Sequence, residues 1–213
     1  MFKFAILIPS YNEYSSLKKI IRKIYKNNSI LIMNDCSNDG TSLIRNKFKK
    51  VIIHNNKYRI GYEKNLTKGF KILISKKFSH IITFDADGEH HTTNIDKVKK
   101  FILKNKNIDL LVGNRSHLNR FSEKIISILF KYRYKIKDPL SGLKVYKTSV
   151  LKKIVHKIEG NFFLIDLLYE FVRRKKNIKN LSIKSVKINN RKPKVGTFLI
   201  SNIKILNCCK YLI

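Results

Sequence analysis

The chain has 213 residues, and its 43% of hydrophobic residues are enough for a packed core, which excludes a wholly disordered basic protein. Lys and Arg number 46 against 14 Asp and Glu, so the formal net charge is +32. Only nine of the basic residues are Arg, Trp is absent and the lysines are spread throughout, unlike a nucleic-acid-binding stripe. A nucleic-acid-binding protein is therefore the remote alternative. We expect no nucleic acid but an anionic ligand or membrane surface as partner.

The cysteines and the apolar segments bear on the cellular setting. Three cysteines, Cys36, Cys208 and Cys209, are too few and badly placed for a disulfide framework. The apolar run at 4–8 is too short for a signal peptide, and no stretch of about 18 apolar residues predicts a membrane span. We expect a cytoplasmic protein.

The first half of the chain alternates short apolar runs with segments of helical periodicity. The apolar runs predict buried strands at 4–8, 30–33, 51–53, 81–84 and 110–112. Helical spacing of apolar residues predicts helices around 17–24, 66–74 and 95–102. This alternation predicts an α/β fold, with a mostly parallel sheet covered by helices on both faces. Ligands of such sheets bind beyond the carboxyl ends of the strands.

The second half has a more mixed pattern. It predicts a helix over 121–132, a short strand over 143–146, a helix over 164–171 and an extended run over 181–188. We expect one main domain over 1–196 and a separate C-terminal segment over 197–213.

The scarce acidic residues gather after the predicted strands. Six of them follow the first, second and fourth strands: Glu13, Asp35, Asp39, Asp85, Asp87 and Glu89. The general preference of acids for loops and helix N-termini accounts for one or two. It does not account for three in five residues directly after an apolar strand. We expect the six carboxylates to converge in one crevice.

Asp85, Asp87 and Glu89 are the strongest candidates for a metal site. Residues two apart in an extended chain point to the same side, so these carboxylates can face one ion. Clustered carboxylates favour a hard cation, Mg²⁺ or Mn²⁺. His90 follows directly and is a weaker candidate, because a loop histidine is more often solvated. Asp35, at the end of the second strand, is expected to contact a base or ribose, with an ordinary helix-capping turn as the alternative.

Five motifs together resemble family 2 glycosyltransferases. They are Ile8–Glu13, Asn34–Thr41, Asp85–His90, Val112–Arg115 and Asp138–Lys144. They occur in the family's order and the resemblance spans residues 4–196, nearly the whole chain. Within the family it is closest to dolichyl- or polyprenyl-phosphate mannosyl- or glucosyltransferases, through a later segment at Arg191–Gly196. The resemblance implies a GT-A fold with a Rossmann-like nucleotide-binding half, a nucleotide-sugar donor, a divalent metal and an inverting reaction.

The chain departs from the family pattern at four places. Asn34 stands in place of the first Asp of its motif, and Cys36 in place of a Gly, so base contacts are expected to differ. Glu89 replaces the usual Gln and adds negative charge beside the metal, and His91-Thr92 replaces a usual Pro pair. The central metal aspartate, Asp87, is retained.

The resemblance also implies roles for individual residues. Metal ligands would be Asp85, Asp87 and Glu89, with Asp85 also placed to contact ribose. The nucleoside would be held by Pro9, Tyr11, Glu13 and Asp35, and phosphates by Arg115, Arg120 and Arg191. Catalysis would depend on Asp87 and Arg115, with Asp138 and Asp166 as candidate bases.

Two acceptors remain open. A sugar hydroxyl in surface-glycan assembly needs a base to remove its proton, whereas a polyprenyl phosphate is already an anionic nucleophile and needs cationic residues to hold it.

The C-terminal segment bears on this choice of acceptor. Drawn as a helix, it places Phe198, Leu199, Ile205, Leu206, Cys209 and Leu212 on one face and Lys204, Asn207 and Tyr211 opposite. This pattern predicts a helix in the interface of an anionic membrane, peripheral on its cytoplasmic face. The alternatives are a helix packed on the domain or a homodimer contact.

Overall fold

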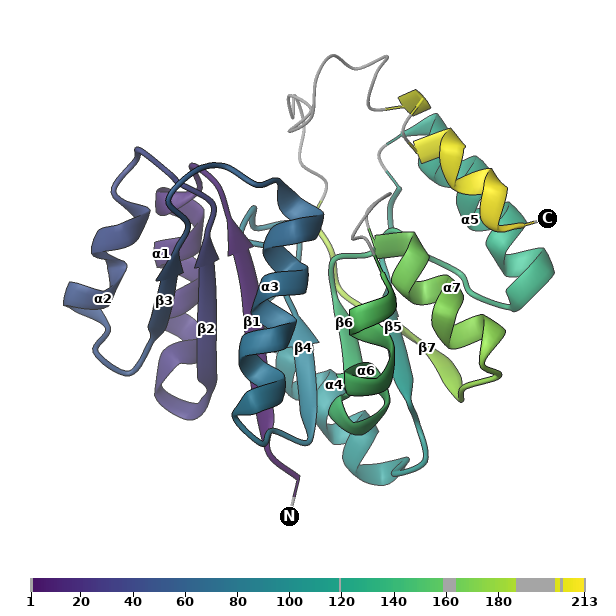
Figure 1. Cartoon of the computed structure of the whole chain (residues 1–213), viewed down its shortest axis with the longest axis horizontal. Helices are drawn as coiled ribbons and strands as arrows, with labels where there is room; N and C mark the ends of the chain where they lie inside the picture. Colours follow the sequence, from purple (N-terminus) through teal and green to yellow (C-terminus); the bar gives the residue numbers. More distant parts are fainter. Residues whose placement is uncertain (1, 119, 159–163, 187–201, 204, 213) are drawn as a thin grey trace.

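The computed structural model of the chain describes residues 2–118, 120–158, 164–186, 202–203 and 205–212 (Figure 1). Its strands form one seven-stranded sheet of order β3-β2-β1-β4-β6-β5-β7. The strands are β1 (Phe4–Ser10), β2 (Ser29–Asn34), β3 (Ile52–Asn55), β4 (His80–Thr83), β5 (Leu110–Asn114), β6 (Lys144–Lys147) and β7 (Ile178–Ser182).

The sheet is mostly parallel, as the alternating sequence pattern predicts. β1 pairs in parallel with β2 and β4, β2 with β3, and β5 with β7. β6 is inserted antiparallel between β4 and β5. The carboxyl ends of β1, β2 and β4 therefore lie at one edge of the sheet, where the acidic residues follow.

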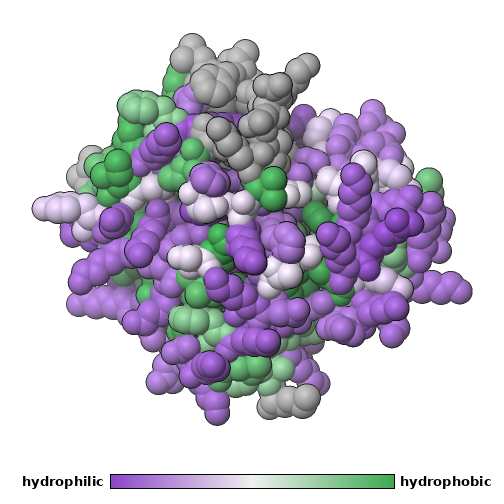
Figure 2. All heavy atoms as spheres, turned by 180° about the vertical axis from the view of Figure 1, so that it is seen from behind, coloured by the Kyte–Doolittle hydropathy of each residue, from purple (hydrophilic) through white to green (hydrophobic). Residues whose placement is uncertain are grey.

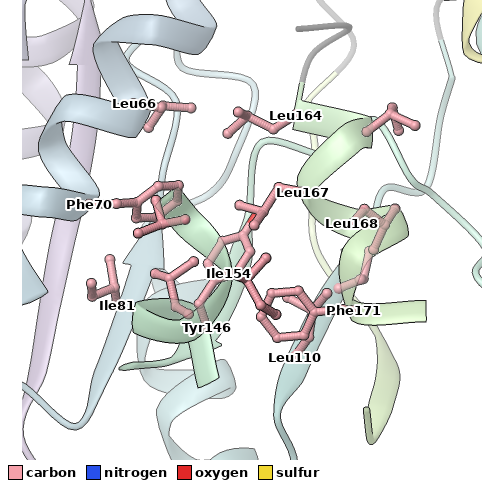
Figure 3. Close-up of a cluster of buried hydrophobic side chains, with 14 of the residues drawn as sticks. Leu66, Phe70, Ile81, Leu110, Tyr146, Ile154, Leu164, Leu167, Leu168 and Phe171 are labelled. Carbon is pink, nitrogen blue, oxygen red and sulfur yellow. The ribbon is translucent and has the colours of Figure 1, made fainter. Parts of the chain in front are cut away.

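Helices cover both faces of the sheet (Figure 1). One apolar cluster packs α1 (Tyr14–Ile24) and α4 (Thr93–Lys104) on one face. The other face carries α3 (Tyr62–Ser75), α5 (Phe121–Tyr134), α6 (Thr148–Ile154) and α7 (Ile165–Arg173). Figure 3 shows the second cluster, in which Phe70, Tyr146 and Phe171 pack edge to face. Because β1 is buried on both faces, its residues are apolar without alternation, and Leu7 and Ile8 enter different clusters.

Gly69 sets how closely α3 approaches the sheet. A Cβ atom at this position would lie 2.5 Å from Leu7 Cδ1 and 2.9 Å from Met33 Cγ. Only the absence of a side chain lets the helix pack this closely on β1 and β2. The position of α3 matters for the site, because the loop before it lines one of the cavities described below.

The structure differs from the sequence expectations mainly in the second half. α6 is not predicted by the pattern, since it is short, although Leu151 and Ile154 anchor it in the core. The extended run expected over 181–188 is instead β7, which begins at Ile178 and ends at Ser182. Beyond it Ser185 pairs with His90 in an isolated bridge, so the chain crosses from β7 to the loop after β4. Residues 187–188 of the expected run lie outside the described residues.

The described part of the C-terminal segment packs on the domain. Residues 202–203 and 205–206 are helical and lead into the 3₁₀ helix η5 (Asn207–Tyr211), which lies beside α5 (Figure 1). Ile205 and Cys208 are buried in the core cluster, and Cys209 and Leu212 pack against it. Of the face expected to meet a membrane, Ile205, Cys209 and Leu212 therefore pack on the protein, against the core cluster to which α5 and α7 also contribute. Phe198, Leu199 and Lys204 lie outside the described residues.

None of the helices in the described ranges has the length and apolar character needed to cross a bilayer.

Candidate active site

Two cavities lie at the carboxyl edge of the sheet, on either side of the Asp85-Ala86-Asp87 segment. The smaller, about 400 Å³, is lined by residues from the ends of β1, β2 and β4, and Pro9, Tyr11, Asp35 and Asp85 are among them. The larger, about 760 Å³, lies between α1 and the loop after β4, and Glu13 and Asp87 line it. The structure thus brings three of the four residues expected at the nucleoside into one cavity and places Glu13 in the other.

Asp35 is a buried anchor for the loop before α3. Its carboxylate accepts hydrogen bonds from the backbone N–H groups of Ile60, at 2.9 Å, and Gly61, at 2.8 Å, and from Asn56 Nδ2 at 3.0 Å. Gly61 has a φ of +88°, a conformation that glycine adopts without strain. Asp35 therefore shapes the smaller cavity through this loop, in addition to lining it.

Asp39 caps the N-terminus of α1, which precedes it in the chain, whereas the turn alternative predicted a cap for the next helix. Its carboxylate accepts a hydrogen bond from the first backbone N–H of α1, at Tyr14, at 2.7 Å, and from the Thr41 hydroxyl at 2.6 Å. Burial would raise the pKa of Asp39, but these hydrogen bonds lower it below its ordinary value. This contact fixes α1 against the loop after β2.

Asp85 is held between α3 and the loop before β6. Tyr62 donates its hydroxyl to Asp85 Oδ1 at 3.1 Å. On the other side the backbone of Gly142 approaches so closely that a Cβ there would lie 1.8 Å from Asp85 Oδ2. Burial and then the Asp85 charge raise the pKa of Tyr62 well above its ordinary value, so it stays a neutral donor. Gly142 is thus required by the position of a carboxylate at the site.

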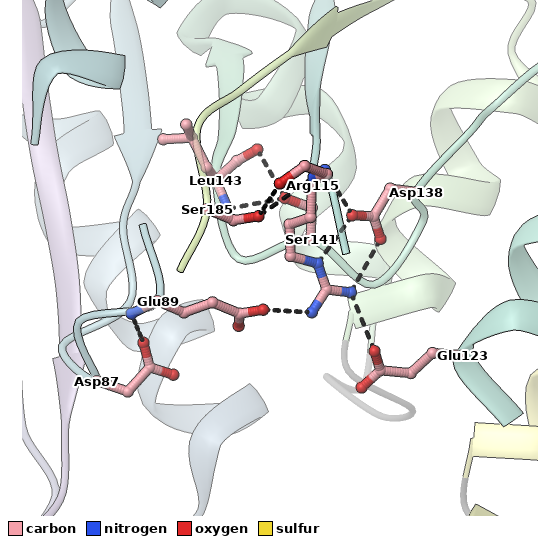
Figure 4. A network of polar contacts seen from close by, with 9 residues as sticks. Asp87, Glu89, Arg115, Glu123, Asp138, Ser141, Leu143 and Ser185 are labelled. Carbon is pink, nitrogen blue, oxygen red and sulfur yellow. Dashed lines mark hydrogen bonds and ion pairs between the residues drawn. The ribbon is translucent and has the colours of Figure 1, made fainter. Parts of the chain in front are cut away.

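Arg115 forms the centre of a buried ionic network (Figure 4). Its Nε and Nη2 donate to the two oxygens of Asp138 at 2.8 and 3.0 Å, and its backbone N–H donates to Asp138 Oδ2 at 3.1 Å. Nη1 donates to Glu89 at 3.2 Å, and Nη2 lies 3.5 Å from Glu123 of α5. Burial alone would lower the pKa of Arg115, but the three carboxylates outweigh it and raise the pKa above its ordinary value.

This network changes the expectations for two catalytic candidates. The side chain of Arg115, expected to bind a phosphate, is only 6% exposed, and its guanidinium is paired with carboxylates inside the protein. Asp138, expected as a base, is buried and accepts three hydrogen bonds from Arg115. Both residues act on the site by fixing the loops that carry them.

The predicted three-carboxylate metal site is not assembled. Glu89 turns to Arg115, while its backbone N–H donates to Asp87 Oδ1 at 2.9 Å (Figure 4). Across the described ranges, no three His, Cys, Asp or Glu side chains gather as ligands for one ion. Burial, with repulsion from Asp87 and Asp85, raises the pKa of Glu89 although Arg115 opposes the shift. The extra charge of Glu89, relative to the usual Gln, is therefore balanced by Arg115.

His90 is buried rather than solvated. It lines the larger cavity with Asp87, its ring lies 5.7 Å from that of Phe84, and neither ring nitrogen has a hydrogen-bond partner in the described structure. Burial lowers its pKa, and the neighbouring Asp85 and Asp87 oppose this shift. A buried, neutral imidazole without a partner beside a carboxylate is a suitable nitrogen donor for a divalent ion.

Lys144 places a buried ammonium group behind the same loops. Its Nζ donates to the Ser141 carbonyl at 2.6 Å, and the residue is 5% exposed. Burial lowers its pKa to about 8, although Asp138 and Asp85 raise it. With Arg115, it supplies the positive charge that lets several carboxylates lie close together.

Three site candidates remain, namely Arg120, Asp166 and Arg191. Arg120 is the residue before α5, and its carbonyl accepts from the Lys124 N–H at 3.2 Å. Asp166 lies in the first turn of α7 and lines neither cavity. The pKa of Tyr146 is raised above its ordinary value, first by burial and then by the charge of Asp166. Arg191 lies outside the described residues.

Sequence reasoning missed the contributions of the loop before α3. Arg59 lies over the Tyr11 ring at 4.1 Å, and Tyr62 bonds Asp85, so both line the smaller cavity. The only sequence indication was Gly61, a turn residue before a helical pattern. Glu123 was missed because a carboxylate in the first turn of a helix is usually a solvated capping residue.

Comparison with known proteins identifies the family. The family model described as glycosyl transferase family 2 matches residues 5–157. An uncharacterised protein of Methanocaldococcus jannaschii is 28% identical, over 94% of this chain and 88% of its own length. A UDP-N-acetylglucosamine–dolichyl-phosphate N-acetylglucosaminyltransferase of Methanococcus voltae is 24% identical, over 85% of this chain and 84% of its own.

Solved structures show the same fold. Glucosyl-3-phosphoglycerate synthase from Mycobacterium tuberculosis, crystallised with Mn²⁺, UDP and glucosyl-3-phosphoglycerate, matches with a TM-score of 0.71 at 13% identity. The match covers 98% of this chain and 80% of that one. The seven-stranded sheet with helices on both faces is therefore a GT-A fold. The chain belongs to glycosyl transferase family 2 and is a nucleotide-sugar-dependent glycosyltransferase.

Proposed function

We propose that this glycosyltransferase moves a sugar from its nucleotide donor to a polyprenyl, dolichyl-type phosphate at a membrane surface, with inversion and with a divalent metal. The assignment of the acceptor depends on where the two candidate bases lie and on whether they could reach a sugar hydroxyl. Asp138 is buried and held by Arg115, and Asp166 lies outside both cavities. A sugar hydroxyl needs such a base, whereas a lipid phosphate attacks as an anion without one.

Two further findings support a lipid-phosphate acceptor. The Methanococcus voltae relative, similar over 85% of this chain, is named for transfer to dolichyl phosphate. The chain also carries a formal charge of +32, which favours two anionic substrates approaching each other. Transfer to a sugar hydroxyl in glycan assembly is the alternative.

The donor would occupy the smaller cavity. Pro9, Tyr11 and the loop fixed by Asp35 would enclose the nucleoside, and Asp85 would receive the ribose. Arg59 lies over Tyr11 at the same cavity and would face the base or the diphosphate. The sugar would then lie toward Asp87 and the larger cavity.

The residues at the larger cavity fit a divalent metal. Asp87 supplies a carboxylate, and His90 supplies buried ring nitrogens that lack a partner in the described structure. This oxygen and nitrogen donor set would suit Mn²⁺. When bound, the ion would stabilise the charge that develops on the departing diphosphate. Arg115 holds Glu89 and Asp138 in place through direct contacts. Lys144 adds a buried positive charge beside them, with its ammonium group donating to the Ser141 carbonyl.

The experiment is an acceptor screen with purified protein. Nucleotide release from each UDP- and GDP-sugar is measured with Mn²⁺, alone and with polyprenyl phosphate, an oligosaccharide or 3-phosphoglycerate. We expect release to be stimulated by polyprenyl phosphate, with a sugar-phosphate lipid as product. Stimulation by the oligosaccharide or by 3-phosphoglycerate, without lipid product, would contradict the proposal.

A further inference from the structure

The solvent-facing side of α5 carries a stripe of large apolar residues beside its exposed basic ones. Phe121, Ile128 and Tyr132 recur at the spacing of one helix face and are 78%, 67% and 92% exposed. The opposite side is apolar too, with Ile126 and Phe130 buried in the core. The buried face is apolar because it packs in the core. The exposed apolar residues make no such core contact, so core packing does not explain why they are apolar. A stripe of large exposed apolar residues marks an interaction surface.

The C-terminal residues extend this surface. Ser122 at the start of α5 donates to Asn202, and Tyr134 at its end donates to the Tyr211 carbonyl, so the two segments run side by side. Ile203 and Leu206 are exposed beside α5. We call the set Phe121, Ile128, Tyr132, Ile203 and Leu206 the apolar face. Figure 2 shows apolar residues gathered on this side of the molecule.

The charges around the apolar face are basic. The exposed charged residues of α5 are Lys124, Lys131 and Arg133, and Lys210 is exposed on the C-terminal segment. The one acidic residue of α5, Glu123, is turned inward to Arg115. Two identical copies meeting through this face would oppose one set of cations to another. Anionic phospholipid headgroups would complement them, while the aromatic and aliphatic side chains enter the interface.

We propose that the apolar face of α5 and the C-terminal segment docks the protein on an anionic phospholipid surface. The Arg115–Glu123 contact joins α5 to the site, so docking would hold the site at the bilayer surface. The inference rests on the proposed function only for the acceptor that the membrane would carry. The docking face itself is inferred from its exposed apolar residues and the basic residues around them.

The test is flotation of the full chain with vesicles of phosphatidylcholine, with and without phosphatidylglycerol. The wild type should float with the anionic vesicles. The variant I128N/Y132S should lower the bound fraction by about tenfold, because it removes two inserting side chains. The control L43N/L103N makes similar changes at exposed leucines on other surfaces and should float like the wild type. Circular dichroism and thermal unfolding check that each variant is folded.

A second pair of variants tests the charges. K124Q/K131Q should weaken flotation at low salt more than K49Q/K50Q, which removes two exposed lysines elsewhere. Equal loss in the two variants would indicate a general charge effect and would overturn the assignment to this face.

Other outcomes separate this inference from the proposed function. Unchanged flotation of I128N/Y132S, or no flotation of the wild type, overturns the docking face, even if a water-soluble short-chain prenyl phosphate accepts sugar. Flotation lost only in I128N/Y132S, with no prenyl phosphate accepted, supports the face and overturns the acceptor. A dimer in light scattering that I128N/Y132S dissociates, without flotation, overturns membrane docking and assigns the face to a second copy.

Discussion

The Arg115 guanidinium and the Asp138 carboxylate form a two-point contact, with Nε and Nη2 donating at 2.8 and 3.0 Å to the two oxygens. Both side chains are almost fully buried, and Glu89 and Glu123 lie against the same guanidinium. The contact joins the loop after β5 to the loop before β6, and through Glu89 to the loop after β4. One arginine thereby sets the relative positions of three loops at the site.

Arg115→Ala should destabilise the fold before it affects any substrate contact. Removing the cation leaves buried carboxylates uncompensated, at a cost of about 3–5 kcal/mol in the free energy of unfolding. Urea unfolding measures this loss. Arg173→Ala, which removes an arginine paired with Glu170 at the surface, should leave the unfolding midpoint unchanged. A stable Arg115→Ala protein with weaker phosphate binding would instead favour the phosphate-gripping role.

Asp87→Asn should remove metal-dependent catalysis while leaving the fold intact. Loss of a charged ligand to the ion should lower the transfer rate by more than about a hundredfold, since a metal contributes several kcal/mol to the transition state. Calorimetry should show that Mn²⁺ no longer strengthens UDP binding. Asp96→Asn, at an exposed carboxylate on α4, is the matched control. Full activity of Asp87→Asn, or of the wild type in excess chelator, would refute the metal assignment.

Gly142→Ala should act through Asp85. The added Cβ would overlap Asp85 Oδ2, so the carboxylate must move, and donor affinity should fall about 10- to 100-fold. A double-mutant cycle measures the coupling: Gly142→Ala should cost little more once Asp85 is already Ala. Additive losses in UDP-binding affinity would show that the glycine acts elsewhere.

Lys144 should make stability rise with pH in the alkaline range. Its pKa is about 8 in the folded chain and 10.5 ordinarily, so between these values the unfolded chain binds more protons. Across this window the free energy of unfolding of the wild type should therefore rise by about 3 kcal/mol relative to that of Lys144→Met. Below the window it should not change relative to the variant, because Lys144 is protonated in both the folded and the unfolded chain. Urea unfolding over the pH series tests this, with Lys152→Met as the control for losing one exposed charge. If the difference in unfolding free energy between the wild type and Lys144→Met stays constant over the pH series, the lowered pKa of Lys144 is contradicted.

Much of the fold could be predicted from local pattern. The buried strands β1, β2, β4 and β5 are continuous apolar runs, because helices cover both faces of the sheet. The helices α1, α3 and α4 have helical periodicity, because each packs one apolar face on the sheet. The antiparallel insertion of β6 was beyond such patterns. Its pairing with β4 and β5 joins residues 32 to 67 positions apart, and no local periodicity encodes that choice.

The order of the residues along the chain is enough to predict that Pro9, Asp35, Asp85 and Asp87 lie at one edge of the sheet, because each follows or ends a parallel strand. Their hydrogen-bond and ionic partners depend on the folded chain. Glu89 and Asp138, predicted as a metal ligand and a base, both pair with Arg115, because buried charges in contact must pair across loops that are distant in sequence. Tertiary packing also buried Ile205 and left Tyr132 exposed, since helical spacing defines a face but not what covers it.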